Sequence, residues 1–470
     1  MIDSKWIRAT LLVAIALTAV CLGSTAIASD TEANTTETNP GETEIPVESV
    51  KISKDSLKLY VGDSDQLTAD VRPYNASNST VTWSSSKSSV ATVSSSGLVK
   101  AVGDGTATIT ASAGGKSDTC TVTVTQVTLT LDRSEITTIT GYQPEVKITV
   151  TPRGLLNDVS VSVASSGIAS AYLYGDTCTI SGDREGQTTV TFKLKNVTRT
   201  CSIDVLAGSC HAYDNSSSKR VDIDIEEKLG VKVLGESEYY NGTIKGSVKA
   251  TVSSSSVKDG SIAAASQNQL IRCINAVESV AGWAPTTIEI DYGTSSTVTV
   301  PATLMKSIAD AGMSLETSST TGGVSLGSST MGKMPGSDWS YSIGKVDNDT
   351  GLEGATVYVI TMKSGSSAMT SFPGSAKVRL PYELGDGMTA FGLKAYTVDG
   401  KGTTSAAVTS YDSINELVEL STNSVTKFAV TYDGEEGGSN ETSSLGYVAI
   451  AVLAVLSVLA VIFSYRYLRM

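Results

Sequence analysis

Residues 49–124 read SVKISKDSLKLYVGDSDQLTADVRPYNASNSTVTWSSSKSSVATVSSSGLVKAVGDGTATITASAGGKSDTCTVTV. Short runs rich in Val, Ile, Leu and Thr alternate there with turn signals made of Gly, Asn, Asp and Ser. Alternation at Val90 and Thr92, and at Ile109 and Ala111, turns one face of a sheet toward a core and leaves Ser and Thr on the other. The pattern predicts an all-β sandwich with Trp83 as its core anchor.

The same stretch carries a set of short landmark sequences. Gly62 and Gly105 fall where strands turn, and a residue without a Cβ can take positive φ there. The stretch resembles the bacterial immunoglobulin-like (Ig-like) domain of group 2. The landmarks that carry this resemblance are Leu57–Gly62, Thr82–Ser85, Val90–Val93, Gly97–Val99 and Gly105–Ala107. The resemblance implies a spacer or adhesive module of a microbial surface protein, at residues 47–126.

A second copy of the pattern follows at residues 127–207. Its glycine-to-proline and glycine-to-cysteine spacings repeat those of the first copy at an offset of 79 to 81 residues. The residues that show this offset are Gly62, Pro73, Gly105 and Cys120 in the first copy and Gly141, Pro152, Gly186 and Cys201 in the second. The second copy has no Trp at the place of Trp83, so we expect a diverged repeat of the same sandwich.

Helical periodicity appears only in the third region, residues 221–433. One apolar stripe comprises Leu270, Ile271, Ile274, Val277 and Val280, and a second comprises Leu304, Met305 and Ile308 after Pro301 at the first helical position. We expect strands around these helices at 287–291, 297–300, 323–326, 355–362, 376–380 and 391–398. The region is therefore an α+β module, joined to the second sandwich by a linker at 208–220. Its last sixty or so residues, from VRLPYELGDG to TKFAVTYD, resemble the terminal module of large microbial surface and wall proteins.

Both ends of the chain indicate export and anchoring. Basic residues, an apolar run and Ala26-Ile27-Ala28 predict a signal peptide at 1–28, followed by a disordered linker at 29–46. An acidic Gly/Ser linker at 434–444 precedes an uncharged segment at 445–465 that is long enough to cross a bilayer. Arg466 and Arg469 follow, so the positive-inside rule places only residues 466–470 in the cytoplasm. We expect a single-pass protein of the cell membrane with its N-terminal ectodomain outside.

Composition argues against several classes of function. The net charge of -13 and the pI near 4.7 disfavour nucleic acid as a partner. The chain has one His, His211, and no CxxC spacing, so we expect neither a metal site nor a Ser-His arrangement. Asp347–Glu353 resembles a calcium loop in outline but lacks its ligand pattern, and a turn is the favoured interpretation. We expect no cofactor and no enzyme activity.

Cysteines and sequons suggest covalent chemistry outside the cell. After removal of Cys21 an odd number of cysteines remains, and Cys178 and Cys201 lie in one module, where they can bridge neighbouring strands. A role for Cys120 and Cys201 as small core residues stays equally open. The N-glycosylation motif N-x-S/T occurs at Asn34, Asn75, Asn78, Asn196, Asn215, Asn241, Asn348 and Asn440.

Two functional hypotheses remain. The first is an adhesive or structural protein of the cell envelope, which binds through loops or strand edges. The second makes residues 221–433 a head that binds a carbohydrate or a receptor, an extracellular glycan or protein, through Tyr239, Trp283, Trp339 and Tyr341. Core packing is the simpler explanation of these four aromatic side chains.

Overall fold

The computed structural model describes residues 44–433, except 216, 400–401 and 426. The expected signal peptide, most of the first linker, the acidic linker, the apolar segment 445–465, the tail and the sequons at Asn34 and Asn440 lie outside the described residues. Within the described residues, no helix combines the length and apolar character that a membrane span requires. Contacts divide the described residues into two compact units. The first comprises residues 44–59 and 63–124, and the second comprises residues 60–62 and 125–433.

The first unit is a β-sandwich of short strands. Its strands are β1 (Ser49–Ile52), β2 (Ser56–Tyr60), β3 (Ser64–Gln66), β4 (Ala69–Arg72), β5 (Thr82–Ser85), β6 (Ala91–Val93), β7 (Leu98–Ala101), β8 (Gly105–Ala113) and β9 (Lys116–Thr125). They form a sheet of order β2-β9-β8-β5, a sheet of order β3-β7-β6 and the pair β1-β4. The mainly-β class and the sandwich expected from the alternation are confirmed.

Two details of the first sandwich differ from the sequence-based expectation. Trp83 is half-buried on β5, and its ring lies against Gly97, whereas Ile52, Leu67 and Ile109 fill the centre of the core. Trp83 thus lies at the margin of the core, on a strand that ends its sheet, and smaller apolar side chains occupy the centre. Thr92 is exposed, because the buried residues next to it, Val90 and Ala91, are consecutive in the sequence instead of alternating.

The second module repeats this strand order. Its elements are β10 (Thr128–Leu131), β11 (Glu135–Ile139), β12 (Glu145–Thr151), η1 (Arg153–Asp158), β13 (Ser160–Val163), β14 (Ala169–Tyr174), β15 (Thr177–Gly182), β16 (Gly186–Leu194) and β17 (Val197–Leu206). The sheet β11-β17-β16-β13 corresponds to β2-β9-β8-β5, and β10-β12-β15-β14 corresponds to β1-β4 together with β3-β7-β6. Gly105 and Gly186, which the spacing paired, both have positive φ, at 131° and 147°.

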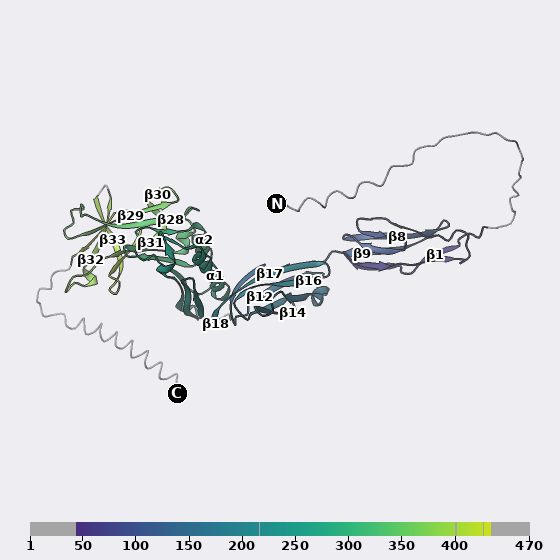
Figure 1. Ribbon diagram of the computed structural model, residues 1–470. Helices are drawn as coiled ribbons and strands as arrows, with labels where there is room; N and C mark the ends of the chain where they lie inside the picture. The colour runs from purple at the N-terminus through teal and green to yellow at the C-terminus, as the bar shows by residue number, and fades with distance from the viewer. Residues whose placement is uncertain (1–43, 216, 400–401, 426, 434–470) are drawn as a thin grey trace, which may run out of the picture. The chain divides into compact units, whose positions relative to one another are not determined.

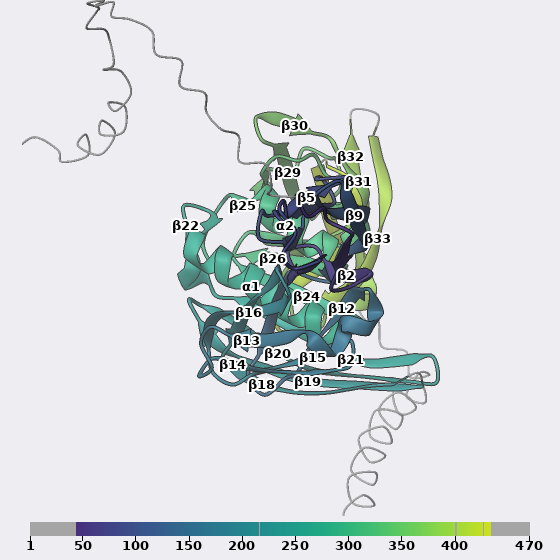
Figure 2. The ribbon, with the colours of Figure 1, turned by 90° about the vertical axis from the view of Figure 1, so that its right-hand side faces the viewer.

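The third module combines long strands with three helices (Figure 1). Its first strands are β18 (Gly208–Asp214), β19 (Ser218–Lys228), β20 (Val231–Tyr240) and β21 (Thr243–Val252), which Figure 2 shows side by side. After them come η2 (Ser254–Ser256), β22 (Val257–Lys258), β23 (Ser261–Ile262), α1 (Ala264–Ala281), β24 (Thr286–Asp291), β25 (Val298–Val300), α2 (Ala302–Asp310), β26 (Ser314–Ser319), β27 (Gly322–Leu326) and α3 (Ser328–Met331). The remainder is β28 (Trp339–Val346), β29 (Thr356–Ser364), β30 (Ser367–Met369), β31 (Ser371–Pro381), η3 (Ala390–Gly392), β32 (Leu393–Asp399), β33 (Gly402–Asp412), β34 (Leu417–Ser424) and β35 (Lys427–Tyr432).

The helices connect the parallel strands of this module. β21 pairs in parallel with β24 and β24 with β26, and α1 and α2 provide the two crossovers. Strands β27 to β35 pair with one another in antiparallel fashion. Strand β33 joins the two halves of the sheet, because it pairs with both β32 and β34. Both helices bury the apolar stripes expected for them, except that Ile271 is only half-buried. The six expected strands are present to within two residues, but β31 starts earlier, at Ser371.

The expected linker at 208–220 is wrong. Residues 208–214 form β18, which pairs with β19 from Gly208↔Ile225 to Asp214↔Lys219. Composition rich in Gly and Ser suggested a junction, but a strand of this composition is stable when its neighbour supplies the hydrogen bonds. At its start, the Thr140 hydroxyl donates to the Gly208 carbonyl at 2.5 Å, so the third module begins directly on the second.

Replacing Gly97 by Ala will destabilise the first sandwich by more than about 2 kcal/mol, because the residue has φ of +83° and a Cβ would lie 2.4 Å from the Leu67 carbonyl oxygen. The matched control is Gly115→Ala, where φ is +77° but a Cβ meets open space. This control carries only the backbone strain of about 1 to 2 kcal/mol. Urea unfolding of a fragment of residues 44–126 measures both losses, and equal losses would contradict the packing argument.

Candidate functional site

The four aromatic side chains proposed for ligand contact do not form a patch. Trp339 and Tyr341 are 1% and 2% exposed, and their rings pack at 5.1 Å between centroids. The Tyr341 hydroxyl bonds to the buried Thr317 hydroxyl at 2.8 Å, and burial raises the pKa of Tyr341 far above its usual range. Trp283 is half-buried against the same core, and Tyr239 lies on β20. Trp339 and Tyr341 are therefore core residues, so the prediction of a ligand contact is wrong for these two.

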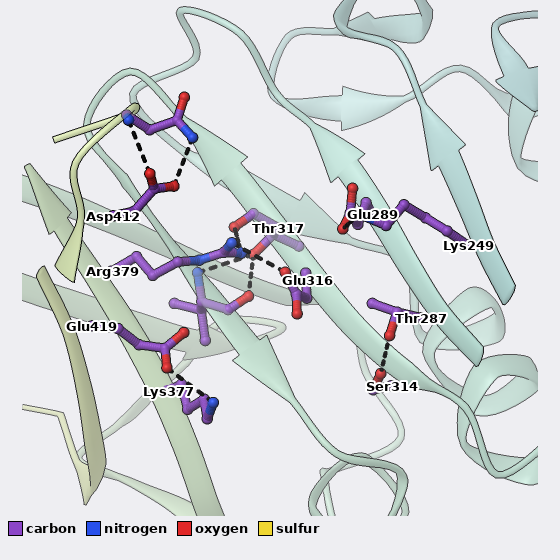
Figure 3. Close-up of polar contacts among 12 residues, drawn as sticks. Lys249, Thr287, Glu289, Ser314, Glu316, Thr317, Lys377, Arg379, Asp412 and Glu419 are labelled. Carbon is purple, nitrogen blue, oxygen red and sulfur yellow. Dashed lines mark hydrogen bonds and ion pairs between the residues drawn. The ribbon is translucent and has the colours of Figure 1, made fainter. Parts of the chain in front are cut away.

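A row of paired charges covers the outer face of the third module's sheet (Figure 3). Arg379 on β31 lies across β27 and reaches Glu316 on β26 at 3.1 Å and the Thr317 carbonyl at 3.3 Å. Gly323 makes this possible, because a Cβ at that position would stand 2.2 Å from the Thr317 carbonyl oxygen. Two further ion pairs flank the arginine: Lys249 with Glu289, and Lys377 with Glu419.

These pairs stabilise the sheet rather than form a reactive centre. Each cation has a carboxylate as its partner. The two lysine pairs, whose ammonium groups are half-exposed, contribute about 0 to 1 kcal/mol each. Between the pairs, the Thr287 and Ser314 hydroxyls bond to each other at 3.0 Å. In this row, no nucleophilic side chain lies beside a base that could activate it, as covalent catalysis requires.

A polar cleft lies where α1 meets the second sandwich. It encloses about 510 Å³ between α1 and the outer face of β11, β17 and β16. Arg272 of α1 binds both carboxylate oxygens of Asp204, at 2.7 and 2.8 Å, and its third nitrogen donates to Gln269. The hydrogen bonds to Asp204 raise the pKa of Arg272. Local sequence patterns carry no signal for this pair, since the two residues are 68 positions apart.

No candidate metal or catalytic group emerges from the described residues. They contain no cluster of three or more His, Cys, Asp or Glu side chains with the geometry of a metal site. In the loop that resembles a calcium site, Asn348 accepts hydrogen bonds from Thr350, which makes a turn, and Asp349 pairs with Lys427 at 2.7 Å. The expected turn is confirmed. Cys210 packs against the core while His211 is exposed, since neighbouring side chains of a strand point to opposite faces.

The six sequons within the described residues are all exposed and all lie between strands. Asn241 has the simplest environment: with Gly242 it forms a two-residue turn, with φ of 48° and 82°, that joins β20 to β21. Tyr240 and Thr243 face each other across this turn and therefore share one face of the sheet. The other five are Asn75 and Asn78 between β4 and β5, Asn196 between β16 and β17, Asn215 between β18 and β19, and Asn348 after β28.

The expected disulfide is absent from the structure. Cys178 and Cys201 are free thiols with no exposed surface. They lie on β15 and β17, which belong to opposite sheets of the second sandwich rather than to neighbouring strands. Each fills its core as a small apolar side chain, and Cys120 does the same in the first sandwich.

Comparison with known families identifies the first sandwich. Residues 46–124 match the bacterial Ig-like domain, group 2, and thereby confirm the resemblance carried by the landmark sequences. A domain of this family implies an extracellular or cell-envelope location.

The curated relatives include two enzymes that match only the Ig-like part of this chain. An uncharacterised protein of Clostridium acetobutylicum is 48% identical over 61 residues, which are 13% of this chain and 6% of that protein. A kappa-carrageenase of Pseudoalteromonas carrageenovora is 46% identical over 67 residues, 14% of this chain and 17% of the enzyme. An alpha-L-arabinofuranosidase of Bifidobacterium longum is 43% identical over 67 residues, 14% of this chain and 6% of the enzyme. The chain thus spans less than a fifth of the length of each of these relatives.

Several solved structures are similar at low scores. Domains 1–6 of the surface layer protein SbsC match at a TM-score of 0.19 and 19% identity, over 44% of this chain and 37% of that chain. The D00-D0 domain of intimin matches at a TM-score of 0.20 and 18% identity, over 33% of this chain and 96% of that chain. Scores this low add nothing to an argument about function.

We expect the folded chain to resist thiol reagents. Burial raises the pKa of Cys178, Cys201, Cys210 and Cys273 to about 11, so the reactive thiolate is scarce at neutral pH. A fragment of residues 44–433 will react slowly with a thiol-specific reagent when native and will present five thiols in urea without a reductant. Three thiols in urea, with a mass two hydrogens lower, would show that a disulfide forms after all.

Proposed function

We propose that this chain is a surface protein of the cell envelope with an adhesive or structural role. The observation that carries the proposal is the tandem of Ig-like sandwiches: the first matches the family, and the second repeats its strand order. Such modules separate or present other domains. The burial of Trp339 and Tyr341 disfavours the alternative of a carbohydrate- or receptor-binding head at residues 221–433.

We further propose that residues 445–465 anchor the chain in the cell membrane, with the described modules outside and residues 466–470 in the cytoplasm. The segment is uncharged and apolar over a length that spans about 30 Å of hydrocarbon. Basic residues follow it and acidic residues precede it, which favours this orientation.

Anchoring is tested by truncation. The full chain will sediment with membranes and resist extraction by carbonate, whereas a variant ending at Ser444 will be recovered in the medium. A matched variant that lacks only residues 434–444 keeps the apolar segment and will stay with the membrane. If the variant ending at Ser444 sediments like the full chain, another part of the molecule holds it.

N-glycosylation of the exposed turns is the second part of the proposal. All six sequons of the described residues are accessible, and Asn241 is the best placed of them. Tyr240 is 60% exposed beside it, so its ring can cover the apolar face of the first sugar. The sugars would keep the exposed ends of β20 and β21 solvated.

In the chain purified from its native host we expect a glycan on Asn241, detected by mass spectrometry of peptides. Thr243→Ala removes the hydroxyl that the acceptor motif requires and will abolish this modification. Thr243→Ser keeps the hydroxyl and will retain it. An unmodified Asn241 in both the wild-type chain and the serine variant would refute the assignment.

A further inference from the structure

Two apolar side chains of the third module stand almost entirely in solvent. Phe391 is 95% exposed in η3, and Ile414 is 90% exposed in the turn between β33 and β34. They are the two most exposed large hydrophobic side chains among the described residues. Scattered exposed apolar residues are ordinary, so exposure alone assigns no function. What distinguishes these two is that ordered turns hold them out and that both lie at one end of the module.

Phe391 is presented by a turn fixed to the last strand. The Asp433 backbone N–H donates to the Gly392 carbonyl at 2.8 Å, and the Thr389 N–H donates to the Tyr432 hydroxyl at 3.2 Å. The Tyr432 ring packs closely on Gly392, where a Cβ would lie 2.4 Å from its edge. These contacts fix the backbone on both sides of Phe391 to the end of β35, and the Phe391 ring faces solvent.

Ile414 is presented by a capped hairpin turn. The Asp412 carboxylate accepts hydrogen bonds from the backbone N–H of Ile414 at 2.9 Å and of Asn415 at 3.1 Å. At the base of the turn, the Tyr382 N–H donates to the Glu416 carbonyl at 2.7 Å. Tyr382 begins the segment that leads to Phe391, so this hydrogen bond connects that segment to the turn that carries Ile414.

Strand directions place both turns where the chain leaves the module. Asp412, at the end of β33, pairs with Leu417 of β34, and Leu417 also pairs with Pro381 at the end of β31. The Ile414 turn therefore lies beside the start of the segment that runs from Tyr382 through η3 into β32. β32 in turn pairs with β35, with Leu393 opposite Tyr432, so the last described strand also finishes there. Asp433 is therefore at the end of the sheet that carries Phe391 and Ile414.

The short distance in sequence from Asp433 to the apolar segment 445–465 points to the bilayer as the partner of these two side chains. Eleven residues, 434–444, separate Asp433 from the apolar segment 445–465. For a Gly-rich sequence, eleven residues correspond to an average end-to-end distance of about 18 Å. A bilayer that holds the apolar segment is then within reach of the two exposed side chains.

We propose that Phe391 and Ile414 insert into the headgroup layer of the bilayer that anchors the chain. This inference rests on the proposed membrane anchoring and adds to it a second contact, which seats the third module on the lipid surface. Burial of apolar side chains at the boundary of headgroups and acyl chains is favourable in proportion to the area removed from water.

Charge around the two turns predicts which lipids are suitable. Glu383, Asp386, Asp412 and Glu416 are exposed acidic residues in these segments, and Asp433 is paired with Lys394. Carboxylates outnumber cations at this surface, so anionic headgroups will repel it, more strongly at low salt. The contact will favour zwitterionic lipids.

The test uses the full chain reconstituted in phosphatidylcholine vesicles, with Phe391→Trp and Ile414→Trp as separate variants. Each difference spectrum against the wild-type chain reports the new Trp. We expect a blue-shifted emission and a loss of fluorescence when the lipids carry a quencher near the headgroups. Tyr174→Trp is the matched control, because Tyr174 is 79% exposed in the second sandwich, and we expect neither change there.

The outcomes distinguish failure of the membrane anchoring from failure of the lipid contact. If the vesicles carry the chain but both new Trp residues behave like the control, the contact is refuted and the anchoring stands. If the vesicles do not retain the chain, the anchoring fails and this inference fails with it. A blue shift that depends on protein concentration but not on the lipid quencher would assign the two side chains to contact with a second copy, and would also refute the lipid contact. Quenching that weakens when phosphatidylserine is added supports the charge argument, and quenching that strengthens would overturn it.

Discussion

All three modules depend on one constraint: each strand must bury one of its faces, and the chain has few aromatic side chains with which to fill the cores. The chain has only five Phe and four Trp, and its cores consist mainly of Val, Ile, Leu and Ala. Smaller side chains fill a core only when its elements pack closely. At particular glycines, paired strands of one sheet also bring their backbones close together. Gly97 against Leu67 and Gly323 against Thr317 are two such places. The cysteines fit the same scheme, as small apolar residues of the core.

Continuity of the hydrophobic core joins the second sandwich to the third module. Ile139 and Leu206, at the ends of β11 and β17, belong to the core of the third module. Beside them, Asp204 and Arg272 make a bidentate pair whose side chains are 16% and 28% exposed, a setting in which such a pair contributes more than at an open surface. The second sandwich and the third module are therefore joined both by apolar packing and by an ion pair. This arrangement suits a protein that has to keep a fixed geometry at the cell envelope.

Local patterns predicted the elements well and their partners poorly. The stripe of Leu270, Ile274 and Val277 predicted α1, and the alternation at Ile109 and Ala111 predicted β8, because these signals reside within a few residues of each other. The Gly and Ser of residues 208–214 carried no such signal, because β18 is stabilised by its pairing with β19. The same reason explains the incorrect disulfide: whether Cys178 and Cys201 share a sheet depends on the strand order of the whole module. Arg379 with Glu316, 63 residues apart, lies beyond local patterns altogether.

Exposure of a side chain is equally a property of the assembled sheet, which is why the candidate surfaces could not be predicted from the sequence. Trp339 and Phe391 are both large apolar residues, yet one is buried and the other is 95% exposed. The difference arises because Trp339 starts a strand that faces the core, while Phe391 sits in a turn whose neighbours are fixed to β35. In a protein built from strands, hydrogen bonding and packing occupy the sheet faces, and the turns between strands remain free to differ. The six described sequons and the two exposed apolar side chains lie in such turns, and turns are where a protein most often makes contact with its surroundings.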